Sequence, residues 1–146
     1  MDELFWEGDA TMAPALTHIW LLVDDMPRAL SFYQDTLGLK LGSNLGEYAE
    51  FEIDQHFMLA LFERTAMQAG EPGIAISPVS GQHATLAFEV ETLDSFCADL
   101  RAKGVVFTSE AANHPEWGLR TFFLRDPDGN LICLYSGIPA SEATQE

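Results

Sequence analysis

The alternation of apolar and polar residues predicts a strand, a helix and a further strand in the first third of the chain. Residues 16–23 form an apolar run that is broken near its start by polar His18, which is typical of a strand. The sequence Asp24-Asp25-Met26-Pro27 then predicts the start of a helix, because an acidic residue suits the N-cap and proline suits the first turn. Gly38 ends this helix before a second strand. The predicted inner face of the helix consists of Ala29, Leu30, Tyr33 and Leu37.

The same pattern returns in the second half of the chain at an offset of 67 residues, which aligns Val23 with Val90. An apolar run over 84–90 predicts a strand, Thr92 suits a helix N-cap, and Gly104 suits the helix end. Each half then adds two more apolar segments of strand length. These lie at 47–53 and 57–62 in the first half, and at 119–124 and 131–135 in the second half.

These elements predict an α+β fold in which two βαβββ units form a curved mixed sheet around a cleft. Each sheet can bury one face under its own helix, which leaves the other face free to line the cleft. Residues between the units are rich in Gly, Pro, Ser and Ala, which predicts a linker loop. We expect one domain over 15–136. Its predicted parts are an acidic N-terminal tail (1–14), the first unit (15–62), the linker loop (63–82), the second unit (83–136) and a C-terminal tail (137–146).

The composition limits the partners and the compartment of the protein. Its net charge of −16 excludes most nucleic-acid roles and argues against anionic membranes, because phosphate binding needs clustered Lys and Arg. The same charge favours solubility, or a preference for cationic small molecules. No apolar run approaches the ~18 residues of a membrane span, and the N-terminus is acidic where a signal peptide would be basic. Cys97 and Cys133 lie in apolar segments, which predicts free buried thiols and, with the other features, a cytoplasmic protein.

Three segments together resemble the vicinal oxygen chelate superfamily, which contains glyoxalase I, bleomycin- and fosfomycin-resistance proteins and extradiol dioxygenases. The segments are 18–33, Leu37-Gly38-Leu39 and Trp117–Leu134, and the last contains the predicted turn Asp126-Pro127-Asp128-Gly129-Asn130. The resemblance covers residues 16–136 and implies paired βαβββ units and a homodimer. It is specific for the superfamily and not for one activity within it.

In the metal-using members of this superfamily, four inward side chains hold one divalent ion such as Zn, Ni, Mn or Fe. The resemblance carries these four positions onto His18, Ala60, Thr85 and Cys133. Alanine cannot ligate, neutral threonine is a poor ligand, and one histidine with one thiol falls short of three protein ligands. We therefore expect no cofactor, with a divalent metal as the alternative and His18 as its weak candidate ligand.

The resemblance and the strand alternation also predict a cleft with aromatic walls, suited to a flat and partly apolar small molecule. His18 could be a hydrogen-bonding group of this cleft, a general base or a metal ligand. Cys133 is expected to be an inert buried thiol, or else a lining residue. Glu89 could be an acid, a base or a counter-ion, or simply the solvent-exposed end of a strand. The expected ligand-binding residues are His18, Trp20, Phe62, Thr85, Thr121, Phe123, Cys133 and Tyr135.

The remaining histidines and Arg120 are expected to lie outside the chemistry. His83 shares a strand face with Thr85 and could belong to a displaced metal site, but a solvent-facing strand entrance is preferred. His56 in a predicted hairpin turn and His114 in a predicted loop are expected to be exposed. Arg120 alternates to the face opposite Thr121, so we expect it to pair with a carboxylate as a structural contact.

The sequence leaves two functions open. The favoured one is a metal-free binding protein of the drug-resistance type, which would hold a small aromatic or cationic compound. The alternative is an enzyme, either a divergent metal-dependent lyase, isomerase or dioxygenase that uses His18, or a metal-free catalyst that uses His18 with Glu89. The first predicts saturable binding without turnover, and the second predicts turnover that is lost in His18→Ala.

Overall fold

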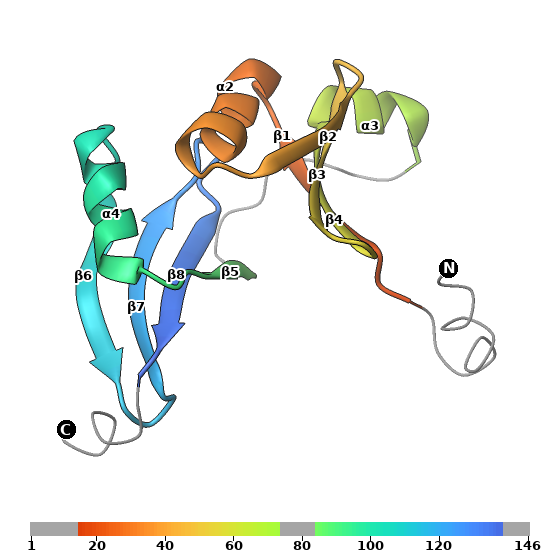
Figure 1. The fold of residues 1–146 in the computed structure, drawn as a ribbon. Coiled ribbons are helices and arrows are strands. Elements are labelled where there is room, and N and C mark those ends of the chain that lie inside the picture. Colours follow the sequence, from red (N-terminus) through yellow and green to blue (C-terminus); the bar gives the residue numbers. More distant parts are fainter. Residues whose placement is uncertain (1–14, 74–83, 139–146) are drawn as a thin grey trace.

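The computed structural model describes residues 15–73 and 84–138, which form two four-stranded mixed sheets. The strand order is β1-β4-β3-β2 in the first sheet and β5-β8-β7-β6 in the second (Figure 1). In each sheet the first strand of the unit pairs in parallel with the last strand, and the other neighbours are antiparallel. The predicted α+β fold with two βαβββ units is confirmed. The predicted N-terminal tail (1–14), His83 and residues 139–146 of the predicted C-terminal tail (137–146) lie outside the described residues, while Gly137 belongs to β8.

The first unit begins its helix as the sequence predicts. The Asp25 carboxylate accepts a hydrogen bond from the backbone N–H of Arg28 at 3.1 Å, and Pro27 occupies the first turn. Gly38 has φ +83°, a left-handed conformation that lets the chain leave the helical segment. The elements of the first unit are β1 (His18–Val23), α2 (Met26–Ser31), the π-helical turn η1 (Phe32–Thr36), β2 (Lys40–Asn44), β3 (Tyr48–Asp54) and β4 (Phe57–Glu63).

The second unit repeats this order, although its helix begins differently. Thr92 precedes the helix but makes no side-chain cap hydrogen bond, so the predicted capping contact is absent there. The turn 126–130 forms as predicted: the N–H of Asp126 donates to the carbonyl of Asn130 at 3.0 Å, and Gly129 has φ +91°. The elements are β5 (Thr85–Glu89), α4 (Leu93–Ala102), β6 (Phe107–His114), β7 (Leu119–Arg125) and β8 (Leu131–Gly137).

The predicted linker loop over 63–82 is wrong in its first part. Glu63 belongs to β4, and residues Arg64–Gly70 form a helix, α3. The Gly, Pro and Ser content that predicted a loop lies mainly after Gly70, while the segment 64–69 contains Arg, Ala, Met and Gln, which are strong helix formers. Residues 74–83 of the predicted linker lie outside the described residues.

The helix-covered face of each sheet forms the core. In β1 the residues at alternate positions, Ile19, Leu21 and Val23, pack into it, and Val23 is fully buried. Cys97 and Cys133 are both free and buried, as predicted. The buried members of the core cluster are Val23, Met26, Ala29, Tyr33, Leu37, Ala49, Phe51, Leu59, Leu61, Leu93, Cys97, Leu100, Phe122, Leu124, Ile132 and Leu134.

The two units are joined by a polar contact inside this core. The hydroxyl of Tyr33, in η1, donates to the Asp126 carboxylate at 2.6 Å, and Asp126 begins the turn between β7 and β8. Tyr33 is fully buried and Asp126 is 5% exposed, so this hydrogen bond is shielded from water. At the surface, the N–H of Asp24 donates to the Asp128 carboxylate at 3.2 Å. These contacts hold the helical segment of the first unit beside the turn of the second, where Figure 1 shows α2 next to the ends of β7 and β8.

Stability is expected to fall above about pH 9, because two buried groups in this core resist deprotonation. Burial raises the pKa of the Cys97 thiol from about 9 to about 11, and burial with the adjacent Asp126 carboxylate raises the pKa of Tyr33 above its usual value. A raised native pKa gives stability that is complete below the unfolded-state pKa and is lost as the pH rises toward the native value. Each group therefore lowers the free energy of unfolding by about 1.4 kcal/mol per pH unit in that window.

Urea unfolding measured from pH 8 to pH 11 checks this expectation. Cys97→Ala should reduce the loss that begins near pH 9, to which the buried Cys133 thiol also contributes, and Tyr33→Phe should reduce the part above pH 10. A wild-type free energy of unfolding that stays flat to pH 11 would contradict it.

Candidate functional site

The face of the first sheet that points away from α2 carries the candidate site. Because side chains alternate along a strand, His18, Trp20 and Leu22 of β1 lie on the face opposite the core residues of that strand. The strand register places Ala60 of β4 beside Trp20 and Glu50 of β3 beside Ala60, so all three residues lie on this open face. Tyr48 and Phe62 form a pair on the same face.

A hydrogen-bonded network joins three polar side chains on this face. The Glu50 carboxylate lies 3.0 Å from His18 Nε2, and the same oxygen accepts a hydrogen bond from the Tyr48 hydroxyl at 2.6 Å. His18 Nδ1 lies 2.9 Å from the Thr17 hydroxyl. The side chains of His18 and Glu50 are 35% and 23% exposed, so the network is reachable from solvent without being fully hydrated. A carboxylate held by two partners keeps one position, which prepares it to bind a third group.

Ala60 explains how Glu50 reaches His18 from two strands away. Ala60 lies on β4, between β1 and β3, and it pairs with Trp20 on one side and with Glu50 on the other. It is fully buried although it lies on the open face. The contact between Glu50 on β3 and His18 on β1 therefore crosses β4 beside a methyl group, the smallest side chain on this face of the strand.

Aromatic rings surround the network. Trp20 and Phe62 are edge to face with centroids 5.3 Å apart, and Tyr48 contacts both rings in the same manner. Burial, with the hydrogen bond to the Glu50 carboxylate, raises the pKa of Tyr48 to about 12, so its hydroxyl stays a donor at neutral pH. Trp20 is 50% exposed and offers a free part of its indole to a ligand. The first open face therefore combines an aromatic wall with a fixed negative charge.

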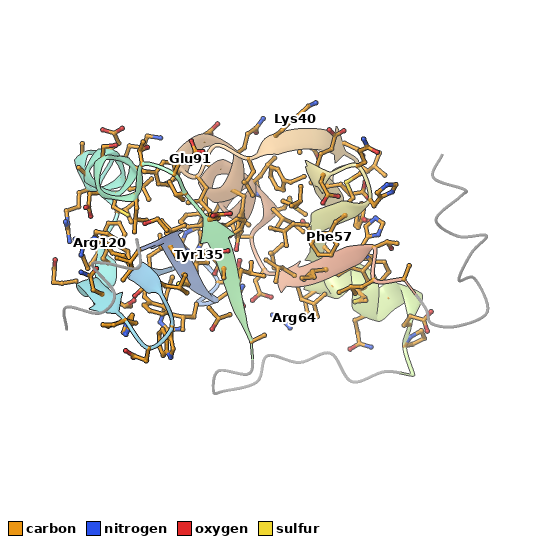
Figure 2. The ribbon with its side chains drawn as sticks, turned by 60° about the horizontal axis from the view of Figure 1, so that its bottom comes forward. Lys40, Phe57, Arg64, Glu91, Arg120 and Tyr135 are labelled. Atoms are coloured by element: carbon orange, nitrogen blue, oxygen red, sulfur yellow. The ribbon has the colours of Figure 1, made fainter. Side chains whose placement is uncertain are left out.

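The second sheet carries the other predicted ligand-binding residues on its own open face. Its register pairs Thr121 with Tyr135 and Phe123 with Cys133, so these residues share the face opposite α4. Thr85 and Glu89 lie on the exposed edge strand β5. Among the described strands, no strand of one sheet is hydrogen-bonded to a strand of the other. Figure 2 shows this separation with Tyr135 on the second sheet and Phe57 on the first. Within the described chain, the predicted residues are therefore divided between two sheets.

Sequence reasoning missed three polar side chains of these faces. Glu50 and Tyr48 alternate with the core residues Ala49 and Phe51, so strand parity alone could have placed them on the open face. His114, for which the sequence predicts an exposed loop position, ends β6 with a side chain that is 25% exposed.

The contacts of His114 explain why it is partly covered. His114 Nε2 lies 3.2 Å from the Thr121 hydroxyl, and Trp117 stacks on its ring with centroids 4.1 Å apart. His56 is exposed in the turn between β3 and β4, as predicted. Arg120 pairs with Asp94 at 3.1 Å, which confirms its structural contact with a carboxylate.

The four positions at which the resemblance placed metal ligands do not fit a divalent ion. Ala60 has no donor atom, Thr85 is a neutral hydroxyl, and burial raises the pKa of the Cys133 thiol, which disfavours the thiolate that a metal needs. His18 and Glu50 supply two donors, fewer than the three protein ligands of a catalytic metal site. Among the residues that the structure describes, no group of three or more His, Cys, Asp and Glu side chains is arranged to hold a metal ion.

Known proteins resemble this chain in sequence and in fold. A family model for the Glyoxalase/Bleomycin resistance protein/Dioxygenase superfamily matches residues 15–134. The uncharacterized protein YraH of Bacillus subtilis (strain 168) is 34% identical over 123 residues, which is 82% of this chain and 96% of YraH.

Every helix within 15–73 and 84–138 is too short or too polar to span a lipid bilayer.

Two solved structures extend this similarity to the fold. A glyoxalase/bleomycin resistance protein/dioxygenase from Nocardioides aligns with a TM-score of 0.72 at 27% identity, covering 94% of this chain and 93% of that one. A lactoylglutathione lyase from Agrobacterium tumefaciens aligns with a TM-score of 0.67 at 25% identity, covering 87% of this chain and 96% of that one.

Proposed function

The chain belongs to the Glyoxalase/Bleomycin resistance protein/Dioxygenase superfamily, and from that membership we propose that it binds a small, partly aromatic cation on the open face of its first sheet. In this proposal the protein holds its ligand without the divalent metal that members of the superfamily often use. Glu50 supplies the counter-charge, and Trp20 supplies the aromatic surface.

The observation that carries the proposal is a fixed carboxylate beside an exposed indole. Glu50 is held by the Tyr48 hydroxyl and by His18 Nε2, while Trp20 packs edge to face against Tyr48 and Phe62. A cation over an indole face gains about 0.5–2 kcal/mol, and a nearby carboxylate adds to this attraction. The net charge of −16 favours the approach of cations over anions.

Removing the indole is expected to weaken binding about thirtyfold. Trp20→Ala deletes the aromatic contact surface, and aromatic residues at the centre of a binding site commonly contribute about 2 kcal/mol. The probe is proflavine, a planar aromatic cation, and the measurement is calorimetric titration at low salt. Trp20→Phe, which keeps a ring, should recover part of the affinity, while Leu45→Ala, at a side chain that is 75% exposed outside this face, should change nothing. Equal affinity for proflavine in Trp20→Ala and wild type would reject the site.

Metal removal is expected to leave this binding unchanged. Elemental analysis of the purified protein should find far less than one equivalent of Zn, Ni, Mn, Fe or Co. A thermal-shift series with these ions should give no stabilisation that depends on His18, because a ligand of the folded state raises stability by RT ln(1 + [L]/Kd). Near-stoichiometric metal, or a shift that disappears in His18→Ala, would overturn the metal-free proposal.

Acid–base catalysis is a second candidate, which the Tyr48–Glu50–His18 network favours. The partner that touches His18 is Glu50, so Glu50 replaces Glu89 in the metal-free version of this candidate. A carboxylate that orients an imidazole is a common arrangement for proton transfer. The metal-dependent version, a divergent lyase, isomerase or dioxygenase, needs donors beyond His18 and Glu50. Assaying lactoylglutathione formation, the chemistry named for the Agrobacterium tumefaciens relative, tests this candidate, and His18→Ala should abolish any turnover.

We also propose that two copies of the chain associate and that the protein works in the cytoplasm. The separate open faces favour a homodimer in which the second sheet of one copy lies opposite the first sheet of the other. The two free buried thiols favour a reducing compartment. Light scattering of the purified protein should give twice the mass of the chain, and a monomer at micromolar concentration would reject the dimer.

A further inference from the structure

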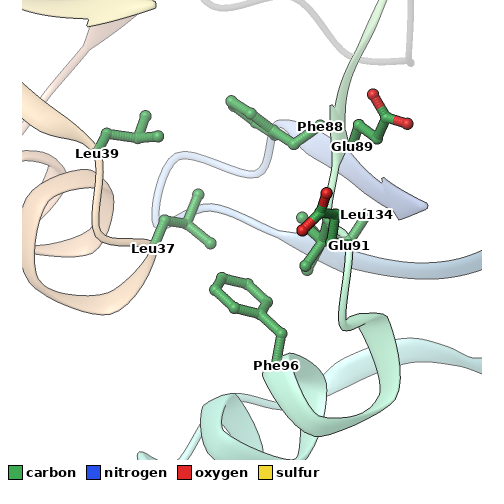
Figure 3. Close-up of a pocket in the computed structure, with 8 residues that line it drawn as sticks. Leu37, Leu39, Phe88, Glu89, Glu91, Phe96 and Leu134 are labelled. Carbon is green, nitrogen blue, oxygen red and sulfur yellow. The ribbon is translucent and has the colours of Figure 1, made fainter. Parts of the chain in front are cut away.

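A cavity lies between the two units, on the helix-covered side of the sheets. It has a volume of about 370 Å³, within the range of pockets that bind small molecules. Leu37 and Leu39 line it from the first unit, Phe88 and Leu134 line it from the second sheet, and Phe96 lines it from α4. In Figure 3, Leu37, Leu39, Phe88 and Phe96 point into one shared space.

The lining is apolar but only partly covered. Leu39, Phe88, Val90 and Phe96 are partly buried side chains at the margin of the core, so the chain leaves apolar surface exposed inside a concave site. Removing such surface from water releases about 25 cal/mol per Å². An apolar group of suitable size would therefore gain stability by entering the cavity.

The charge at the margin of the cavity has one sign. Among the described residues that line it, Glu89 and Glu91 are the ionisable ones, and Figure 3 shows Glu91 beside Leu134 with Glu89 beyond it. Neither carboxylate forms an ion pair within the part of the chain that the structure describes. Glu89 pairs with Tyr135 on the other face of β5, so Glu91 is the carboxylate beside the cavity. An apolar cavity with a carboxylate at its edge complements a molecule with an apolar body and a cationic head.

We propose that this cavity between the units is a second binding site, which takes an aliphatic amine. The alkyl chain occupies the space among Leu37, Leu39 and Phe96, and the ammonium group faces Glu91. The site is separate from the open face of the first sheet, because Phe88 and Leu134 lie on the core side of the second sheet. An amine bound there contacts both units.

Three probes with the same alkyl chain test the site: octylammonium, octan-1-ol and octanoate, each titrated calorimetrically into the full chain. We expect one saturable site for octylammonium, about two- to fivefold weaker binding of the alcohol, and weaker binding again of the carboxylate. The estimate follows from the small energy of a solvent-exposed ion pair. Glu91→Gln should lower the affinity for octylammonium to about the affinity for octan-1-ol, and it should leave the affinity for octan-1-ol unchanged.

Variants at the apolar lining distinguish binding in the cavity from binding elsewhere on the protein. Leu39→Trp, which fills the cavity, should abolish octylammonium binding and leave proflavine binding intact. Leu45→Trp, at an exposed position in the turn between β2 and β3, is the matched control. If Leu39→Trp does not fold, Leu39→Gln replaces it in the test, because glutamine keeps the size of the side chain but places a polar group in the cavity. The proposal is overturned by absence of saturable binding, by octanoate binding as well as octylammonium, or by unaltered binding in both Leu39 variants. It is also overturned if Leu39→Trp converts a dimer to monomers, since a second copy of the chain would then cover the cavity.

Discussion

Replacing Asp126 with alanine is expected to lower the free energy of unfolding by about 3–5 kcal/mol, enough to unfold a marginal domain. Asp126 is 5% exposed and its two carboxylate oxygens accept four hydrogen bonds. One comes from the Tyr33 hydroxyl of the other unit, and three come from the N–H groups of Asp128 and Asn130 and the Asn130 side-chain amide. Alanine leaves these donors without their acceptor, and each buried donor without a partner costs about 1–3 kcal/mol.

Urea unfolding of variants that remove different numbers of these hydrogen bonds measures how much each bond contributes to the free energy of unfolding. Tyr33→Phe removes one donor together with its own need for a partner, so we expect a loss of about 0.5–1.5 kcal/mol. Asp126→Asn keeps one carbonyl acceptor and should fall between Tyr33→Phe and Asp126→Ala. Asp54→Ala is the matched control, because that carboxylate is exposed at the end of β3 and accepts one backbone hydrogen bond from His56. If Asp126→Ala lost no more stability than Asp54→Ala, the contact between the units would not stabilise the fold.

The resemblance and the strand pattern predicted the fold because local signals determine most of it. The N-cap at Asp25, the turn at 126–130 and the helix end at Gly38 each depend on a few neighbouring residues. The helix α3 was missed because the Gly and Pro residues after it outweighed its own helix formers in the prediction of one long linker. Local chemistry is therefore sufficient for the element order but not for every boundary.

The candidate site depends on contacts between residues far apart in the sequence, and there the sequence-based prediction is incomplete. His18 and Glu50 are 32 positions apart, and their contact crosses a third strand at Ala60. From the sequence, Ala60 is interpreted as a lost ligand, whereas in the structure it lies on the strand that the His18–Glu50 contact crosses. Such a relation follows from the register of three strands, which a single sequence does not specify.

Replacing Ala60 with leucine should therefore disrupt the site while every member of the network is still present. Ala60 is fully buried between Trp20 and Glu50, and three added carbon atoms would occupy the space that the Glu50 side chain crosses. Overpacking of this kind costs about 1–3 kcal/mol of stability. Displacing Glu50 also removes the counter-charge that the cation meets, and a charge-assisted contact of this kind, worth about 1.5–3 kcal/mol, corresponds to about a ten- to hundredfold loss of proflavine affinity.

Calorimetric titration and urea unfolding of Ala60→Leu test both effects in one protein. Met58→Leu is the matched control, because it introduces the same residue two positions earlier on the same face of β4, with little change in volume. Glu50→Gln should reproduce the loss of affinity without the overpacking, since it keeps the shape of the side chain and removes its charge. If Ala60→Leu folded and bound proflavine as tightly as Met58→Leu, the route of Glu50 across β4 would be irrelevant to binding. A loss shared by Ala60→Leu and Glu50→Gln, but absent in Met58→Leu, would identify the carboxylate held over Ala60 as the group that selects a cation.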